Sequence, residues 1–318
     1  MVRVGITGCD NLRAAELVRI LINHPDVDLM WVKSTAYGTM RLDQIVPGIV
    51  GECGLTINPE GELGEVDVLF MCGAREQYTD TFNALRLNDN VRIIDLSDCH
   101  NLEGLENESW QYGLSEMQRR VLVHGTGRAT IPGAAAMASV LSLLPLAHNL
   151  MLNSPLALQV AVGALAFPDK GKTIDGLDET EWAAQQQREI EAVLKQCQPG
   201  FAQPVSLTLS PHDGRRTITV TVQLKCDIGE QQVRQLYDQY YDDHNFVFIV
   251  DRPIVTADIE NTNKCLIHLS KNELTGMLTV QSAIDLLIKG SSGNAVHVMN
   301  LMFGLHERAG LALKGTGC

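Results

Sequence analysis

The first residues constrain the fold most, because strand and helix patterns alternate there in quick succession. Val2–Thr7 is a short, mostly apolar run with β-branched residues, and it leads into the glycine turn Gly5-Ile6-Thr7-Gly8. Four apolar residues then recur at the i, i+3, i+4, i+7 spacing of a helix: Ala14, Leu17, Val18 and Leu21. His24-Pro25 ends that helix, and Val27–Lys33 has the pattern of a second strand. A β-α-β unit of this kind predicts a parallel sheet with right-handed crossovers.

Two further apolar runs extend this pattern. Val66–Cys72 and Val91–Leu96 show no alternation, which is typical of strands that are buried on both faces of a parallel sheet. We therefore expect residues 1–150 to form an α/β, doubly wound domain of the Rossmann-like type. A helix that follows Pro132-Gly133 completes this region.

The second half of the chain changes character. Along Thr217–Leu224 apolar and polar residues alternate, as on an antiparallel strand with one face in water. Asp213-Gly214 predicts a hairpin that joins Val205–Ser210 to this strand. Residues 151–290 are therefore expected to form an α+β domain, and residues 291–318 a helix that returns to the first domain. The other elements expected in the α+β domain are two helices and three strands: Glu181–Leu194, Val233–Tyr240, Phe246–Val250, Cys265–Leu269 and Met277–Val280.

Composition argues against several classes of partner. With 25 Lys+Arg and 38 Asp+Glu the formal net charge is −13, so the mean field repels nucleic acid and anionic membrane surfaces. No uninterrupted apolar stretch approaches the roughly 18 residues that a membrane span needs. The eight cysteines stand singly, without a Cys-x-x-Cys pair, which argues against a disulfide scaffold or a structural zinc site. We expect a cytoplasmic protein with no bound metal, nucleic acid or membrane.

The glycine turn raises the question of a nucleotide. Gly5 and Gly8 at a strand-to-helix turn are able to let a pyrophosphate approach the helix N-terminus, but they also serve simply to close a tight turn. A full fingerprint has a third glycine, where this chain has Asn11. Ser34, at the end of the second strand, stands where a ribose or its 2′-phosphate is read, while Thr35 is a poor substitute for an arginine. The two interpretations stay open at this point.

Seven short motifs, taken in order, span nearly the whole chain. They are Gly5-x-x-Gly8, Ile22-Asn23-His24-Pro25, Asp95-Leu96-Ser97, Tyr112-Gly113-Leu114-Ser115-Glu116, Ile131-Pro132-Gly133, Lys289-Gly290-Ser291-Ser292-Gly293-Asn294-Ala295-Val296 and Met299-Asn300-Leu301-Met302-Phe303-Gly304. Together they resemble the N-acetyl-γ-glutamyl-phosphate reductase family.

The resemblance implies a fold, a reaction and a set of binding residues. It implies a Rossmann-like NADP domain and an α+β domain like the C-terminal domain of semialdehyde and glyceraldehyde-phosphate dehydrogenases, with homo-oligomers formed through the second domain. The family's reaction, in arginine biosynthesis, is the NADPH-dependent reduction of N-acetyl-γ-glutamyl phosphate to the semialdehyde with release of phosphate. The implied cofactor-binding positions are Gly5, Thr7, Gly8, Asn11, Ser34, Gly293 and Asn300.

The position of the family's nucleophile holds a residue without nucleophilic chemistry. The reaction needs a thiolate that attacks the acyl phosphate and holds a thioester for hydride to reduce. The resemblance places this cysteine directly after Pro132-Gly133, where the chain has Ala134. Neighbouring positions differ from the family as well, with Ala135 and Met137 in place of an aromatic residue and a threonine. A thioester therefore cannot form at this position.

Two further roles are missing by the same comparison. The family's general acid/base histidine corresponds to Gln186, whose amide does not exchange a proton near neutral pH. The family's phosphate-binding arginine corresponds to Asn101, which has no charge to offer an acyl phosphate. Ala74-Arg75-Glu76 replaces a Pro-His-Gly motif next to the expected cofactor.

Other reactive residues have plainer interpretations. Cys72 and Cys99 follow predicted sheet strands and are candidates for a relocated nucleophile, but a free cysteine more often fills apolar space, which is the interpretation we favour. His297 is expected to be a satisfied helix residue rather than a catalytic one. Arg128 and Lys289 are suited to bind an anion or to serve as scaffold residues.

Three hypotheses follow for the function. The first is a family homologue that keeps the fold, has lost the phosphorylating reduction, and binds a nucleotide or an acyl-amino-acid ligand. The second is an active reductase that transfers hydride directly, without a thioester. The third is a structural or regulatory partner, for instance of an active paralogue in the same pathway.

Overall fold

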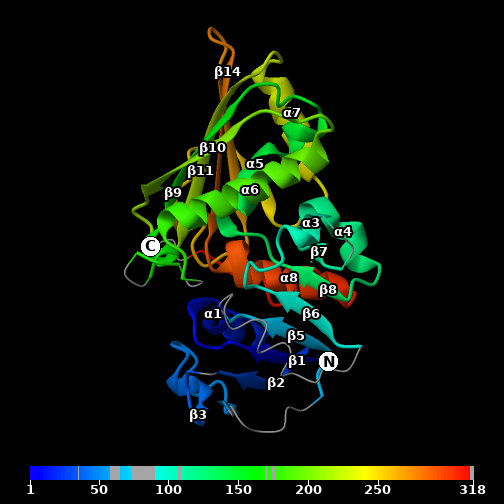
Figure 1. Cartoon of the computed structure of the whole chain (residues 1–318), viewed down its shortest axis with the longest axis vertical. Helices are drawn as coiled ribbons and strands as arrows, with labels where there is room; N and C mark the ends of the chain where they lie inside the picture. The colour runs from blue at the N-terminus through cyan, green and yellow to red at the C-terminus, as the bar shows by residue number, and fades with distance from the viewer. Residues whose placement is uncertain are drawn as a thin grey trace. The chain divides into compact units, whose positions relative to one another are not determined.

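The computed structural model describes residues 1–34, 36–57, 65–73, 90–106, 109–168, 171–173 and 176–315. The chain forms two compact units: residues 1–132, 174–176 and 291–312 in the first, and residues 133–173, 177–290 and 313–318 in the second. Each unit is built around a six-stranded sheet (Figure 1). The boundary falls at residue 133, whereas the sequence analysis set it at residue 150, so the helix after Pro132-Gly133 belongs to the second unit.

The first unit contains a parallel sheet with the strand order β2-β1-β5-β6-β8-β7. All of its neighbouring strands pair in parallel. The strands are β1 (Val2–Thr7), β2 (Val27–Lys33), β5 (Val68–Met71), β6 (Arg92–Asp95), β7 (Gln111–Tyr112) and β8 (Arg128–Thr130). This confirms the expected Rossmann-like sheet. Because β1 has β2 on one side and β5 on the other, the chain reverses direction across the sheet at β1, where folds of this class bind their ligands beyond the carboxyl ends of the strands.

The helices of the first unit follow from local sequence. They are α1 (Leu12–Leu21), α3 (Glu103–Glu106), α4 (Ser115–Val123) and α8 (Gly293–Met302), with a 3-10 turn at Leu42–Gln44 and a small ladder of β3 (Met40–Arg41) with β4 (Thr56–Ile57). Asn11 caps α1 by accepting the N–H of Ala14, and the four apolar residues predicted for its inner face are all buried. α8 packs against α1, α4 and β6.

The second unit contains a mixed sheet with the strand order β10-β9-β11-β14-β13-β12. The strands are β9 (Leu156–Val162), β10 (Val205–Pro211), β11 (Thr217–Lys225), β12 (Val247–Val250), β13 (Cys265–Asn272) and β14 (Met277–Asp285). The outer pairs β10·β9 and β12·β13 are parallel, and the inner pairs are antiparallel. The α+β prediction is confirmed.

The predicted hairpin across Asp213-Gly214 is wrong. β9 lies between β10 and β11, so the two strands that flank this turn do not pair with each other. The chain between Pro211 and Thr217 crosses β9 to reach β11. Two strand spacings are about 9.6 Å, which this segment is long enough to span. Arg216 N–H is satisfied at 2.8 Å by the Glu260 carboxylate rather than by a hairpin partner.

Three helices cover one face of this sheet: α5 (Ala134–His148), α6 (Glu179–Cys197) and α7 (Glu230–Tyr241). Figure 1 shows them together on their sheet; short 3-10 turns at Ala164–Ala166 and Thr256–Asp258 and a π turn at Ile288–Ser292 complete the chain. α5 packs on the central strands β11 and β14 and is flanked by α6 and α7, so every residue from Ala134 to Ala147 is buried.

A proline inside α5 is accommodated by a neighbouring helix. Pro145 has no N–H to give to the carbonyl of Leu141, one turn earlier. The hydroxyl of Tyr241 on α7 donates to that carbonyl at 2.5 Å, and Tyr237 donates to the Ser142 carbonyl at 2.6 Å. These two bonds fix α7 against α5.

Candidate functional site

Ala134 is the first residue of α5, directly after the N-cap Gly133, and it is 8% exposed. The first N–H groups of a helix have no partner within the helix itself. Here two of them are capped from α6, because Gly133 donates to the Glu189 carboxylate at 3.1 Å and Ala136 donates to the Gln186 side-chain oxygen at 2.9 Å. The nucleophile position and the acid/base position inferred from the resemblance therefore lie at one helix end, in the second unit.

Gln186 is fully buried, and its amide lies flat against Gly133. A Cβ at position 133 would lie 2.3 Å from Nε2, 2.4 Å from Oε1 and 2.7 Å from Cδ of Gln186. Oε1 is used by Ala136, whereas Nε2 has no hydrogen-bond partner in the described part of the chain. This amide works as a helix cap and spacer, and it has no proton to exchange near neutral pH.

Asn101 lies in the first unit, where it is 3% exposed and neutral. Its Oδ1 accepts from the Thr130 hydroxyl at 2.5 Å, and its Nδ2 donates to Asp98 at 3.4 Å. Asp98, at a positive φ of 60°, also pairs with Arg13 at 3.5 Å, and Arg13 donates to the Leu96 carbonyl at 2.5 Å. The arginine nearest to Asn101 in this network is thus bound to protein groups.

The two glycines of the β1–α1 turn have packing reasons. Gly8 has a φ of 74°, and a Cβ there would lie 2.2 Å from the backbone nitrogen of Gly73. A Cβ at Gly5 would lie 2.5 Å from the Trp31 ring. Asn11, in the place of a third glycine, caps α1 and donates to the Cys72 carbonyl at 2.6 Å.

The remaining cofactor candidates are held by protein contacts. The Thr7 hydroxyl donates to the Phe70 carbonyl at 3.4 Å, and Gly293 is the buried first residue of α8. Asn300 pairs with His24 at 3.0 Å and donates to the carbonyls of Glu307 at 3.2 Å and Ala309 at 3.0 Å. Burial lowers the pKa of His24 below its usual value. These contacts hold α8 against His24 and against the segment that follows α8.

Ser34 follows β2 and is 1% exposed. Its hydroxyl donates to the Asp10 carboxylate and accepts from the backbone N–H groups of Ala36 at 3.2 Å and Tyr37 at 3.1 Å. Ser34 was expected at this position from the sequence, whereas its partner Asp10 was not. Thr35 and residues 74–76 lie outside the described residues.

The thiols considered as relocated nucleophiles differ in burial. Burial raises the pKa of the Cys72 thiol far above its ordinary value and that of neighbouring Cys9 to about 12, so neither forms a thiolate near neutral pH. Cys99 is half-buried, and its N–H donates to the Ser97 hydroxyl at 3.4 Å. The burial of Cys72 favours the interpretation that its side chain fills apolar space.

Two polar networks in the first unit escaped the sequence analysis. Asp95, at the end of β6, accepts from the Ser97 hydroxyl at 2.6 Å and pairs with His100 at 2.8 Å. His297 on α8 pairs with Glu307 at 2.8 Å, and Glu307 also binds Arg119 of α4. An acidic residue at the end of a buried strand was the visible signal for the first network; the second joins distant segments and has no local signal.

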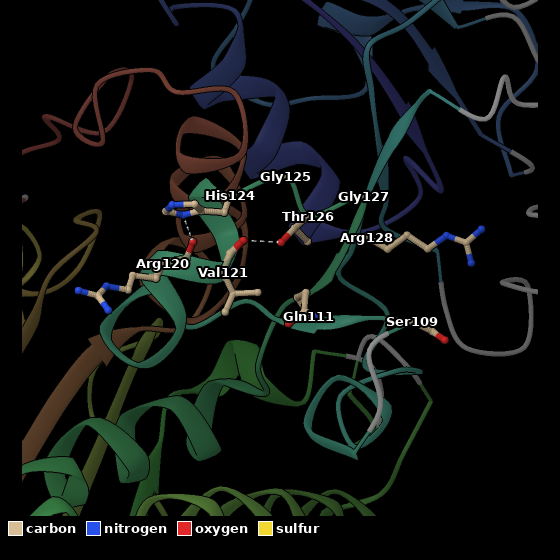
Figure 2. Close-up of a pocket in the computed structure, with 9 residues that line it drawn as sticks. All are labelled: Ser109, Gln111, Arg120, Val121, His124, Gly125, Thr126, Gly127 and Arg128. Atoms are coloured by element: carbon tan, nitrogen blue, oxygen red, sulfur yellow. Dashed lines mark hydrogen bonds between the residues drawn. The ribbon is translucent and has the colours of Figure 1, made fainter.

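A cavity of about 890 Å³ lies at the amino-terminal ends of β7 and β8, away from the carboxyl edge of the sheet. Figure 2 shows Arg120 and Arg128 pointing in opposite directions, so their charges do not converge on one ligand. His124 and Thr126 at its rim bond to the carbonyls of Arg120 and Val121 at 2.6 and 2.8 Å.

Within the described ranges, no three His, Cys, Asp or Glu side chains gather to hold a metal ion. No helix among these residues is long and apolar enough to cross a membrane.

Comparison with known proteins places both units. Residues 3–124 match the family described as semialdehyde dehydrogenase, NAD binding domain, and residues 183–285 match semialdehyde dehydrogenase, dimerisation domain. The chain is 36% identical to N-acetyl-gamma-glutamyl-phosphate reductase of Parabacteroides distasonis over 322 residues, covering 99% of each chain. It belongs to the N-acetyl-γ-glutamyl-phosphate reductase family. The reductase of that name from Phocaeicola vulgatus is 35% identical over 325 residues, again covering 99% of both chains.

Solved structures with low identity share the reductase family's fold. Aspartate semialdehyde dehydrogenase II from Vibrio cholerae superposes with a TM-score of 0.69 at 11% identity, covering 96% of this chain and 99% of that one. Aspartate semialdehyde dehydrogenase with NADP from Candida albicans gives a TM-score of 0.71 at 11% identity, covering 95% and 98%. The Rossmann-like NAD(P)-binding domain indicates a nicotinamide dinucleotide cofactor, and the dimerisation domain supports a homo-oligomer.

Proposed function

We propose that this member of the reductase family retains the scaffold and has lost the thioester-forming reduction of the acyl phosphate. Ala134 at the first position of α5 carries the proposal, because its methyl group has no lone pair with which to attack an acyl phosphate. The position equivalent to the family's nucleophile is thereby chemically silent, whatever surrounds it.

Two further residues support the same conclusion. Gln186, at the inferred acid/base position, uses its oxygen to cap α5 and has no titratable proton. Asn101, at the inferred phosphate-binding position, is a neutral amide held between Asp98 and Thr130. Loss of the nucleophile, the acid/base group and the cation together removes every residue through which the covalent route would run.

The retained function we propose is non-covalent binding. The first unit would bind a nicotinamide dinucleotide, and the second would take part in a homo-oligomer and accept an acyl-amino-acid ligand at the end of α5. In this role the protein would act as a binding or regulatory partner, for example of an active paralogue.

The reverse reaction tests this proposal. The protein is mixed with N-acetyl-glutamate semialdehyde, phosphate and NAD⁺ or NADP⁺, and the absorbance of the reduced cofactor is followed. The Parabacteroides distasonis reductase, run in parallel, is the positive control. We expect no formation of reduced cofactor above a protein-free blank; steady turnover would refute the proposal.

A second candidate is an oxidoreductase that transfers hydride directly to a carbonyl ligand. The observation in its favour is Nε2 of Gln186, a buried donor beside the first turn of α5 that has no hydrogen-bond partner among the described residues and is able to polarise a carbonyl oxygen. Oxidation of NADH or NADPH by an N-acyl aldehyde or thioester in the absence of phosphate would support it.

A further inference from the structure

We infer that the first unit of this chain selects NAD(H) over NADP(H), and that the Asp10 carboxylate makes this selection at the adenosine ribose. The inference rests on one part of the proposed function, namely that this unit binds a nicotinamide dinucleotide. It departs from the NADP that the family resemblance implies.

The position of Asp10 follows from the register of the sheet. β1 and β2 pair in parallel with Thr7 opposite Lys33, so the β1–α1 turn and the residue after β2 lie at the same edge. Asp10 from the turn and Ser34 after β2 meet there in a hydrogen bond, with Asp10 partly exposed. In Rossmann-like domains the end of the second strand is where the 2′ position of the adenosine ribose is read. A carboxylate therefore stands at the ribose-reading position although no acidic residue ends β2.

Ser34 cannot donate to a phosphate at this position. A serine hydroxyl has one proton to donate and two lone pairs. Ser34 donates its proton to Asp10, and its lone pairs accept from the N–H groups of Ala36 and Tyr37. The hydroxyl is also 1% exposed, so its capacity is spent within the protein. Of the two, the partly exposed Asp10 carboxylate is the group that would accept hydrogen bonds from a ribose diol.

A 2′-phosphate, unlike a ribose diol, is unfavourable at this edge of the sheet. It carries a charge of about −1.5 to −2, and its usual partner is an arginine fork. Arg13, the arginine of the adjacent first turn of α1, is 12% exposed and is committed to Asp98 and the Leu96 carbonyl. Lys33 is the last residue of β2, and consecutive side chains of an extended segment point to opposite faces, away from Ser34. The described contacts place a negative charge, not a fork, beside Ser34.

The turn itself fits a dinucleotide. Gly8 at a positive φ brings the β1–α1 turn close to the backbone at Gly73, and residue 8 itself has no Cβ to project from that turn. The Asn11 side chain accepts from one N–H of that turn, the N–H of Ala14. The fit therefore extends to the pyrophosphate and ribose, and fails only for a phosphate on the 2′ oxygen.

Binding, rather than activity, tests the inference. The dissociation constants of NADH and NADPH are measured on the full-length protein by nicotinamide fluorescence. We expect NADH to bind at least ten-fold more tightly. Asp10→Asn keeps an oxygen to accept from Ser34 but removes the charge, so the ratio should fall at least five-fold, mainly through tighter NADPH binding. Asp28→Asn, which removes an exposed carboxylate from β2, should leave the ratio of the two dissociation constants unchanged.

The outcomes separate this inference from the proposed function. Equal or tighter binding of NADPH by the wild type overturns the inference and leaves the loss of acyl-phosphate reduction untouched. An unchanged ratio in Asp10→Asn overturns the role of Asp10. If neither nucleotide binds, both the inference and the nucleotide-binding part of the proposed function fail. Should Asp10→Asn not fold, as judged by thermal unfolding, the wild-type ratio decides alone.

Discussion

The Gln186 amide and Gly133 are in such close contact that a Cβ on Gly133 would lie 2.3 Å from Nε2 of Gln186. Gln186 comes from the middle of α6, and Gly133 is the N-cap of α5. Together with the hydrogen bond from Ala136, this contact means that Gln186, at the acid/base position inferred from the resemblance, fixes how α5 and α6 meet. Gln186 therefore has a structural role in this chain.

Gly133→Ala is therefore expected to destabilise the protein. The backbone at Gly133 has φ −59° and ψ 141°, which alanine adopts without strain, so the cost is the collision with a buried amide. We expect the free energy of unfolding in urea to fall by about 1–3 kcal/mol. Gly127→Ala is the matched control, because no atom of the described residues lies within 4 Å of a Cβ there; its change should stay within about 0.5 kcal/mol.

A double-mutant cycle shows whether Gln186 is the cause. Removing the amide in Gln186→Ala takes away the atoms with which the new methyl group collides, so the effect of Gly133→Ala should shrink by about 1 kcal/mol or more in that background. Additive effects of the two substitutions would mean that the described contact does not determine the cost.

A cysteine and a histidine at the two inferred catalytic positions are not expected to give catalysis. Ala134→Cys with Gln186→His supplies a thiol at the first residue of α5 and a titratable ring beside it. Asn101 still offers only an amide bonded to Asp98 and Thr130, so no cation meets the acyl phosphate. We expect turnover only when Asn101→Arg is added, as measured by cofactor oxidation with the acyl phosphate. Turnover by the double variant would contradict the role assigned to position 101.

Acid should weaken the contact between α8 and the segment that follows it. The hydrogen bond from His297, with the charge of that ring and a smaller contribution from Arg119, outweighs the opposing effect of burial and lowers the pKa of Glu307 from 4.5 to about 2. A carboxyl group with a depressed pKa stabilises the fold above pH 4.5, and that stabilisation is lost as the pH falls toward 2. Glu307 is 14% exposed, so the contribution lost by pH 3 is on the order of 2 kcal/mol.

Glu307→Gln provides the comparison. The free energy of unfolding of this variant, measured in urea, should lie furthest below that of the wild type at pH 7. The difference between the two proteins should be about 2 kcal/mol smaller at pH 3. Glu52→Gln removes an exposed carboxyl group and should show no such narrowing. A constant difference between wild type and Glu307→Gln across this range would rule out the proposed stabilisation.

The open face of the second sheet is expected to mediate self-association. Gln159, Thr221 and Gln281 form a row across β9, β11 and β14, while the alternate residues of those strands are buried under the helices. Light scattering should give at least twice the chain mass of 34.9 kDa. The double variant Gln159→Lys, Gln281→Lys should have a lower mass in solution. Gln239→Lys, which changes an exposed residue of α7, should not. A monomeric wild type would contradict the expectation.

Local patterns predicted much of the fold. β1 and β2 coincide with the predicted segments, because an apolar run followed by a glycine turn or bounded by a proline determines its own ends. The hairpin at Asp213-Gly214 failed because strand order is not local: β9, from earlier in the chain, inserts between the two strands. Turn residues alone do not indicate which strand lies alongside.

The site shows the same division. Family motifs singled out Ala134 and Gln186, whose roles stay predictions, but they did not indicate the contact of Gln186 with Gly133, which depends on how α6 packs against α5. Ser34 was found from its place after a strand. Its partner Asp10 was not, because their contact depends on the parallel register of β1 and β2. Contacts between separate elements are the part that the sequence pattern leaves undetermined.

The rate of cofactor oxidation with N-acetyl-γ-glutamyl phosphate tests the central claim most directly. The assay uses the full-length protein with NADH and with NADPH in turn, beside the Parabacteroides distasonis reductase. With Ala134, Gln186 and Asn101 in place, we predict a rate equal to that of the protein-free blank with both cofactors. Sustained oxidation with stoichiometric release of phosphate would contradict the account.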